Sequence, residues 1–180
     1  PVQSMNHLRL LVAALLVLIA AISIEQKNFL TIFSAGYLQG WLWLGLSGIT
    51  ALVIGDFFSF RSYTILSPQL GSVLTTMSPA SALLFGIVLV DEHINLIGII
   101  GMAITITGVM SISLGRAQRK SIPDHGHGGV SKGIVFGILA AACHGAALAF
   151  SKKGFLVQAG TQYPVGPLSA TFIRIIAALI

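Results

Sequence analysis

Charged residues are scarce in this chain. Only 8% of its 180 residues are Asp, Glu, Lys or Arg, whereas 55% are hydrophobic. A soluble domain contains about 25% charged residues, so this composition indicates that lipid is the solvent. There is one cysteine, Cys143, which excludes a disulfide framework within the chain. Because Cys143 lies in an apolar run, we expect its thiol to pack as a small hydrophobe rather than to react or bind a ligand.

Two sequence patterns are also missing. No G-x-x-x-x-G-K-[ST] phosphate-binding motif occurs, so this chain is not expected to hydrolyse ATP. No basic run alternates with aromatic residues, which argues against nucleic-acid binding. The ten Lys and Arg residues lie mostly at the ends of apolar segments and in one loop, a placement typical of helices oriented in a bilayer. The partner that this placement indicates is the lipid bilayer, and no cofactor is expected.

The apolar residues fall into six segments, several of them long enough to cross a bilayer as helices. The predicted spans are residues 8–24, a helix from near Tyr37 to 60, 70–90, 94–114, 133–151 and a sixth beginning near Val165. The sequence starts at Pro1 and stops inside the apolar run 172–180, so we expect a fragment that is truncated at both ends. The predicted fold is an all-α integral membrane protein that crosses the membrane several times.

The third span contains a proline, Pro79, near its middle, where a helix loses one backbone hydrogen bond and tends to kink. Thr75, Thr76 and Ser78 flank the carbonyl that Pro79 leaves unpaired. Either these hydroxyls bond to their own helix, or a substrate satisfies the free group. We therefore predict a broken helix here, followed by the acidic pair Asp91-Glu92.

Three spans carry small or hydroxyl residues at spacings of three and four, which places them on one helical face. The three faces are Gly71, Thr75, Ser78, Ala82 and Gly86; Gly101, Thr105, Gly108 and Ser111; and Gly133, Gly137, Ala141, Gly145 and Ala149. Lipid gives no hydrophobic reward for helix association, so close approach at small residues supplies the packing. Three such faces predict a compact bundle.

A polar segment, residues 116–132, separates the fourth span from the fifth. It includes Asp124, His125 and His127 in a glycine-rich tract. Imidazole and carboxylate groups can bind metals, but this spacing fixes no coordination geometry. We predict a linker loop and no metal site.

The chain shows weak internal similarity. Residues 4–15 and 169–180 both contain a serine, an arginine five residues later (Arg9 and Arg174) and a run of aliphatic residues and alanine. Five spans separate the two copies, and an odd number inverts the second copy in the membrane. The pattern therefore predicts inverted repeats, with a shared site near the bilayer midplane.

Residues 55–62 (GDFFSFRS), residues 71–79 (GSVLTTMSP) and the glycines at 98, 101 and 108 together resemble the EamA-type drug/metabolite transporter superfamily. The resemblance implies a ten-helix fold of two five-helix repeats, in which the fourth helix carries a proline and ends at a glutamate. Residues 1–115 would be helices two to five of the first repeat, and residues 133–180 the first helix and part of the second helix of the second repeat. Asp91 and His144 depart from the pattern, because the family has a small residue and an aromatic residue at these places.

The resemblance implies a secondary transporter, an exporter or permease of small metabolites or amphipathic compounds, driven by a gradient and located in the plasma or inner membrane. Charge placement favours a cytoplasmic location for residues 116–132, whereas the resemblance implies the opposite side. Two other classes remain as alternatives. An integral-membrane enzyme would need more convergent acid, base or metal ligands than this chain offers. A structural membrane subunit would need no solute path.

Two ionisable residues inside the spans are candidates for function. A carboxylate at a helix centre costs about 2.5–3.5 kcal/mol, so Asp56 is either a proton relay or cation counter-charge, or lies near the interface paired with Arg9 or Arg61. His144 titrates near neutral pH and either carries a proton or binds substrate, or bonds to a neighbouring helix. Together with Thr75, Thr76, Ser78 and Pro79, these two residues form the predicted substrate or proton path.

Overall fold

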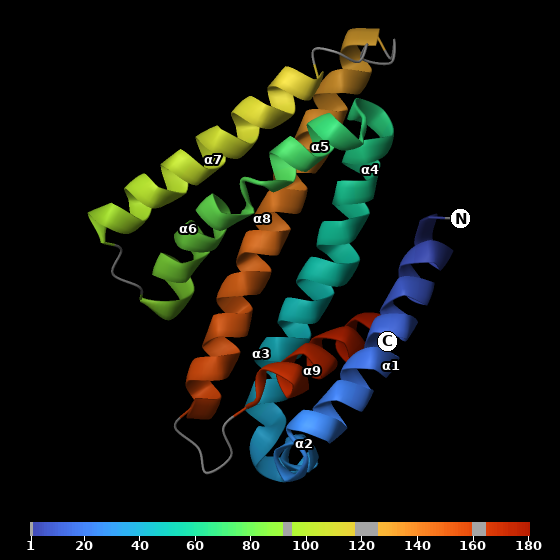
Figure 1. Cartoon of the computed structure of the whole chain (residues 1–180), viewed down its shortest axis with the longest axis vertical. Helices are drawn as coiled ribbons and strands as arrows, with labels where there is room; N and C mark the ends of the chain where they lie inside the picture. Colours follow the sequence, from blue (N-terminus) through green and yellow to red (C-terminus); the bar gives the residue numbers. More distant parts are fainter. Residues whose placement is uncertain (1, 92–94, 118–125, 160–164) are drawn as a thin grey trace. The chain divides into compact units, whose positions relative to one another are not determined.

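The computed structural model describes residues 2–91, 95–117, 126–159 and 165–180, and these contain helices and turns but no strand (Figure 1). The elements in order are α1 (Val2–Ile24), α2 (Lys27–Leu30), η1 (Thr31–Phe33), η2 (Ala35–Tyr37), α3 (Leu38–Gly48), η3 (Ile49–Gly55), α4 (Asp56–Leu66), α5 (Pro68–Thr75), α6 (Ser78–Val90), α7 (Leu96–Ala117), α8 (Gly126–Ala159) and α9 (Pro167–Leu179). The all-α prediction is confirmed for this part of the chain.

Four helical segments are long and apolar enough to cross a membrane: Asn6–Ile24, Leu38–Leu66, Pro68–Val90 and Val130–Ala159. Leu96–Gly108 and Pro167–Leu179 are shorter apolar helices. Each of the six predicted spans thus falls on helical segments, two of them made of more than one element, and the chain is a multi-pass membrane protein. Its exposed large hydrophobic side chains, such as Val88 and Ile97, are what a lipid-facing surface requires.

The boundaries of the polar segment differ from the sequence-based ones. α7 continues to Ala117, and α8 already begins at Gly126, so residues 126–132 belong to a helix. Residues 118–125, with Asp124 and His125, lie outside the described residues, as does Glu92.

The chain forms two compact units, one made of residues 1–53 and 147–180 and the other of residues 54–146. In the first unit, α9 packs against both α1 and α3. Its core consists of Ala21, Phe29, Ile32, Tyr37, Leu44, Ala170 and Ile173, with a second cluster of Leu10, Ile175 and Ala178. At Gly48 the backbones come so close that an added Cβ would overlap the carbonyl of Arg174, so this crossing of α3 and α9 requires glycine.

In the second unit, the small residues of α8 are buried at every fourth position. Gly133 contacts Leu66, Gly137 contacts Leu74, and Gly145 contacts α6 so closely that an added Cβ would lie 2.5 Å from the backbone nitrogen of Ala82. Ala141 and Ala149 are also buried, the latter within the first unit. The predicted packing face of residues 133–151 is therefore confirmed.

The face predicted for residues 94–114 does not pack in the same way. Gly101, Thr105, Gly108 and Ser111 are exposed, and nothing lies within 4 Å of a Cβ built on either glycine. Instead α7 contacts α5, and Met102 and Ile106 on a different part of its surface are half-buried. Among the described residues, the expectation of a packed small-residue face was therefore wrong for this helix. Small residues allow a neighbouring helix to come close, but they do not determine whether a neighbouring helix is there.

The break in the third span is confirmed, with its position refined. α5 ends at Thr75 and α6 begins at Ser78, so Pro79 lies in the first turn of α6 rather than inside a helix. A proline there removes no helical hydrogen bond, because the first N–H groups of a helix have no partner within it. Gly71 and Gly86 of the predicted face are buried, and Thr75, Ser78 and Ala82 are half-buried.

Candidate functional site

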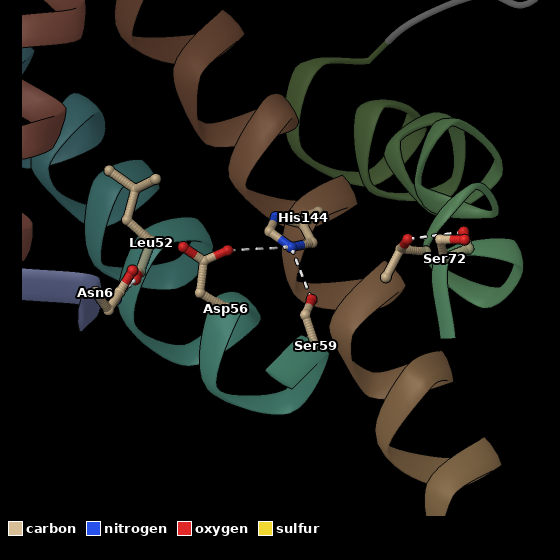
Figure 2. A network of polar contacts seen from close by, with 7 residues as sticks. Asn6, Leu52, Asp56, Ser59, Ser72 and His144 are labelled. Atoms are coloured by element: carbon tan, nitrogen blue, oxygen red, sulfur yellow. Dashed lines mark hydrogen bonds and ion pairs between the residues drawn. The ribbon is translucent and has the colours of Figure 1, made fainter. Parts of the chain in front are cut away.

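Asp56 and His144 lie close together within the second unit. The Asp56 Oδ1 atom is 3.8 Å from the His144 Nε2 atom, and the two side chains are 13% and 27% exposed. Figure 2 shows the carboxylate on α4 and the imidazole on α8 pointing toward each other. The structure therefore brings the two candidate ionisable residues to one place.

The local structure before Asp56 is unusual. α3 continues into a π-helical segment, η3, which ends at Gly55, so Asp56 is the first residue of α4. π-Helical turns widen a helix and are frequent at functional sites. The carbonyl of Leu52, in this segment, accepts a hydrogen bond of 3.2 Å from the Asn6 side chain (Figure 2). Such a bond satisfies a backbone group that lipid cannot hydrate.

Ser59 completes the contact with His144. Its hydroxyl oxygen is 3.4 Å from His144 Nε2, and its side chain is 5% exposed. Asp56 and Ser59 are three residues apart on α4, so they share a helical face. Ser59 was not among the residues predicted from the sequence, although its spacing of three from Asp56 places both on one face once this segment is helical.

The arrangement can hold and transfer a proton. At 3.8 Å the carboxylate and the imidazole are within ion-pair range but beyond a hydrogen bond of 2.7–3.2 Å. If Asp56 gives a proton to His144, the neutral pair becomes an ion pair with no change in net charge. In a membrane this exchange avoids an isolated charge, which would be costly.

The hydroxyls around the helix break bond to their own backbone. Thr75 Oγ1 donates to the Ser72 carbonyl at 2.9 Å, and Thr76 Oγ1 donates to the Val73 carbonyl at 2.6 Å. These are the contacts expected of hydroxyls that satisfy their own helix. Ser78 is half-buried, and Pro79 is exposed.

The break is connected to α8 beside His144. The Ser81 hydroxyl donates to the Ala141 carbonyl at 2.6 Å, and it also lies 3.0 Å from the Ser78 carbonyl. Gly145, which follows His144, packs against Ser81. The start of α6 therefore contacts the same stretch of α8 that carries the imidazole. Ser81 is a second residue that sequence reasoning missed, and no local pattern pointed to it.

Among the residues that the structure describes, no three or more His, Cys, Asp or Glu side chains lie close enough together to hold a metal ion. The site is thus a pair of ionisable side chains with hydroxyls around it, set in helices of membrane-spanning length.

Comparison with known families identifies the protein class. The EamA-like transporter family matches residues 1–114. The chain belongs to the EamA-like transporter family. This confirms the resemblance found in the sequence, and membership makes the protein a membrane transporter. Members of this family are typically not enzymes. No curated protein and no solved structure matched the chain.

Proposed function

We propose that this EamA-like transporter is a secondary transporter, an exporter or permease that moves small metabolites or amphipathic compounds across the cell membrane. A proton gradient drives the transport, and Asp56 and His144 carry the proton. The observation that supports this most strongly is the 3.8 Å contact between Asp56 Oδ1 and His144 Nε2, formed by helices of spanning length.

The two groups suit gradient coupling for an energetic reason. A carboxylic acid and an imidazole can pass a proton between them with no change in the net charge of the pair. That charge changes by one unit only when the pair takes up a proton from one side of the membrane or releases it to the other. Carboxylate and histidine side chains inside a membrane commonly form proton relays in transporters, which supports a role of this pair in coupling.

The proposed solute path passes the break between α5 and α6. Ser78 and Pro79 lie where one helix ends and the next begins, and backbone groups at such breaks can bind a solute. Ser81 connects this break to α8 three residues before His144. Thr75 and Thr76 donate their hydroxyls to backbone carbonyls at the end of α5, so these carbonyls are already bonded and do not need a solute.

The proposed architecture is a ten-helix inverted repeat. Residues 1–115 supply helices two to five of the first repeat, 116–132 connect the repeats, and 133–180 supply the first helix and part of the second helix of the next repeat. The similarity between residues 4–15 and 169–180 supports this, since the first segment lies in the first half of α1 and the second covers nearly all of α9.

The test is flux into vesicles containing the full chain, with a panel of labelled metabolites and an imposed pH gradient. Asp56→Asn should abolish stimulation by the gradient while the protein remains in the membrane. Asp91→Asn is a matched control, because Asp91 is exposed and has a φ of 51°, a left-handed conformation that asparagine tolerates. Equal gradient stimulation in Asp56→Asn and in the unmodified chain would contradict proton transfer through this residue.

A further inference from the structure

A second polar contact joins distant parts of the chain within the first unit. The Glu25 carboxylate, just after α1, accepts hydrogen bonds from the backbone N–H groups of Leu168 at 2.8 Å and Ser169 at 3.0 Å. The Ser169 hydroxyl donates to the same carboxylate. One side chain thus holds the first turn of α9, although 143 residues separate Glu25 from Leu168.

This contact replaces a local helix cap. The first N–H groups of any helix have no partner within it and are commonly bonded by the side chain just before the helix. In α9 that position is Gly166, which has no side chain and makes no side-chain cap bond. The positive end of α9 therefore depends on the negative charge of Glu25.

The Glu25 carboxylate packs so closely against the backbone of Gly166 that a side chain at this position would displace it. A Cβ added to Gly166 would overlap the Glu25 carboxyl group. The backbone of Gly166 has a φ of −72°, which any residue adopts. An alanine here would therefore push the carboxylate away without straining its own backbone.

Away from this contact, α1 and α9 contribute hydrophobic side chains to two buried clusters. Ala21, Ala170 and Ile173 form one cluster, and Leu10 and Ala178 contribute to another. In lipid such contacts gain little over contacts with acyl chains. The Glu25 contact lies just beyond the candidate span Asn6–Ile24, where water can hydrate the groups if they separate. The polar contact at this end is thus strong when formed and replaceable by water when broken.

We propose that Glu25 and the start of α9 form a latch that opens and closes one end of the α1–α9 pair during the transport cycle. The inference rests on the proposed transport function. It gives that function a conformational step that is separate from the Asp56–His144 pair. The charge-assisted bonds favour the closed form, and hydration of Glu25 and the α9 N–H groups permits the open form.

Distances between spin labels test the latch without any known substrate. The labels are placed at Ile24→Cys and Thr171→Cys in a Cys143→Ser background, which leaves Glu25, Gly166 and Ser169 intact. In proteoliposomes we expect a short and a long distance. Glu25→Ala and Gly166→Ala should each lower the ratio of short to long by about five-fold or more, since bonds to a charged group are lost.

Ser23→Ala is the matched control, because Ser23 is exposed and its hydroxyl donates to Ile19 within α1. It should leave the distance distribution unchanged. A single short distance in the unmodified chain would overturn the latch and leave Glu25 as a permanent cap. Identical distributions in Glu25→Ala, Gly166→Ala and the unmodified chain would overturn it as well.

Cross-linking shows whether opening is needed for transport. The same cysteine pair is bridged with a reducible reagent as long as the short distance, and flux is measured with a metabolite that the unmodified chain transports. We expect loss of flux, recovery on reduction, and no loss with a reagent as long as the open distance. Full flux in the closed, bridged protein would overturn the proposal. If the proposed proton coupling is wrong, Asp56→Asn will keep the stimulation of flux by the pH gradient. The spin-label distances do not depend on that result, so the two proposals can fail separately.

Discussion

His144 Nε2 lies 3.8 Å from Asp56 Oδ1 and 3.4 Å from the Ser59 hydroxyl, so one ring nitrogen of α8 faces these two side chains of α4. The second ionisable contact, between Glu25 and α9, belongs to the other unit. The proposed proton transfer involves the first contact, and the proposed latch involves the second. The two proposals therefore depend on separate residues and can be tested separately.

Replacing His144 should change the pH dependence of transport. An imidazole can take up and release a proton, whereas the amide of glutamine stays neutral. We expect flux to depend less steeply on pH in His144→Gln than in the unmodified chain. His7→Gln is the control, since His7 is exposed on α1. A retained slope in His144→Gln would assign the imidazole to packing.

Variants at Ser59 and Ser62 should distinguish a hydroxyl that positions His144 from one that only packs two helices together. Ser59→Ala removes the hydroxyl beside His144, so we expect flux to fall and its pH midpoint to shift. Ser62 is buried one turn along α4, and its hydroxyl donates to the Gly133 carbonyl at 3.0 Å. Ser62→Ala should lower the stability by about 1 kcal/mol and keep the pH midpoint. Flux profiles and thermal unfolding in detergent measure the two effects, and the same midpoint in both variants would argue against a positioning role for Ser59.

The packing of α8 on α6 predicts a strong effect at Gly145. A Cβ there would lie 2.5 Å from the backbone nitrogen of Ala82, so the helices must move apart. We expect Gly145→Ala to lose about 1–3 kcal/mol of stability, as overpacked sites do.

Gly101→Ala provides the opposite case on α7. Nothing lies within 4 Å of its added Cβ, so alanine should be neutral or stabilise the helix by up to about 1 kcal/mol. Thermal unfolding in detergent compares the two variants. Equal losses would show that the close approach at Gly145 does not determine stability.

Tyr37 should make the protein sensitive to alkaline conditions. Burial raises the pKa of its hydroxyl above the usual 10.0, and the nearby negative charge of Glu25 adds to this, against an opposing hydrogen bond with Thr31. The folded state therefore holds this proton more tightly than the unfolded chain does. Stability should be full below about pH 10 and fall as the pH rises through the folded pKa. Unfolding measured against pH should show a smaller alkaline decline in Tyr37→Phe, and an equal decline would contradict this assignment.

The sequence by itself determined the solvent, the helices and part of the packing. Few charges and long apolar runs indicate lipid, and apolar runs of this length cross it as helices, in which each backbone group is bonded within its own segment. The four-residue spacing from Gly133 to Ala149 identified a buried face, and Pro79 located the break to within a few residues. These properties depend on local spacing, which the sequence contains directly.

Only the tertiary structure decided which distant groups meet. Asp56 and His144 were separate candidates until α4 and α8 were oriented, and Ser59 and Ser81 gained a role from the same packing. The exposed glycines of α7 had the same spacing signal as the buried ones of α8. The rotation and register of a helix against its neighbours depend on contacts across the whole bundle. For that reason the pairing of Glu25 with α9 could not be predicted from either segment alone.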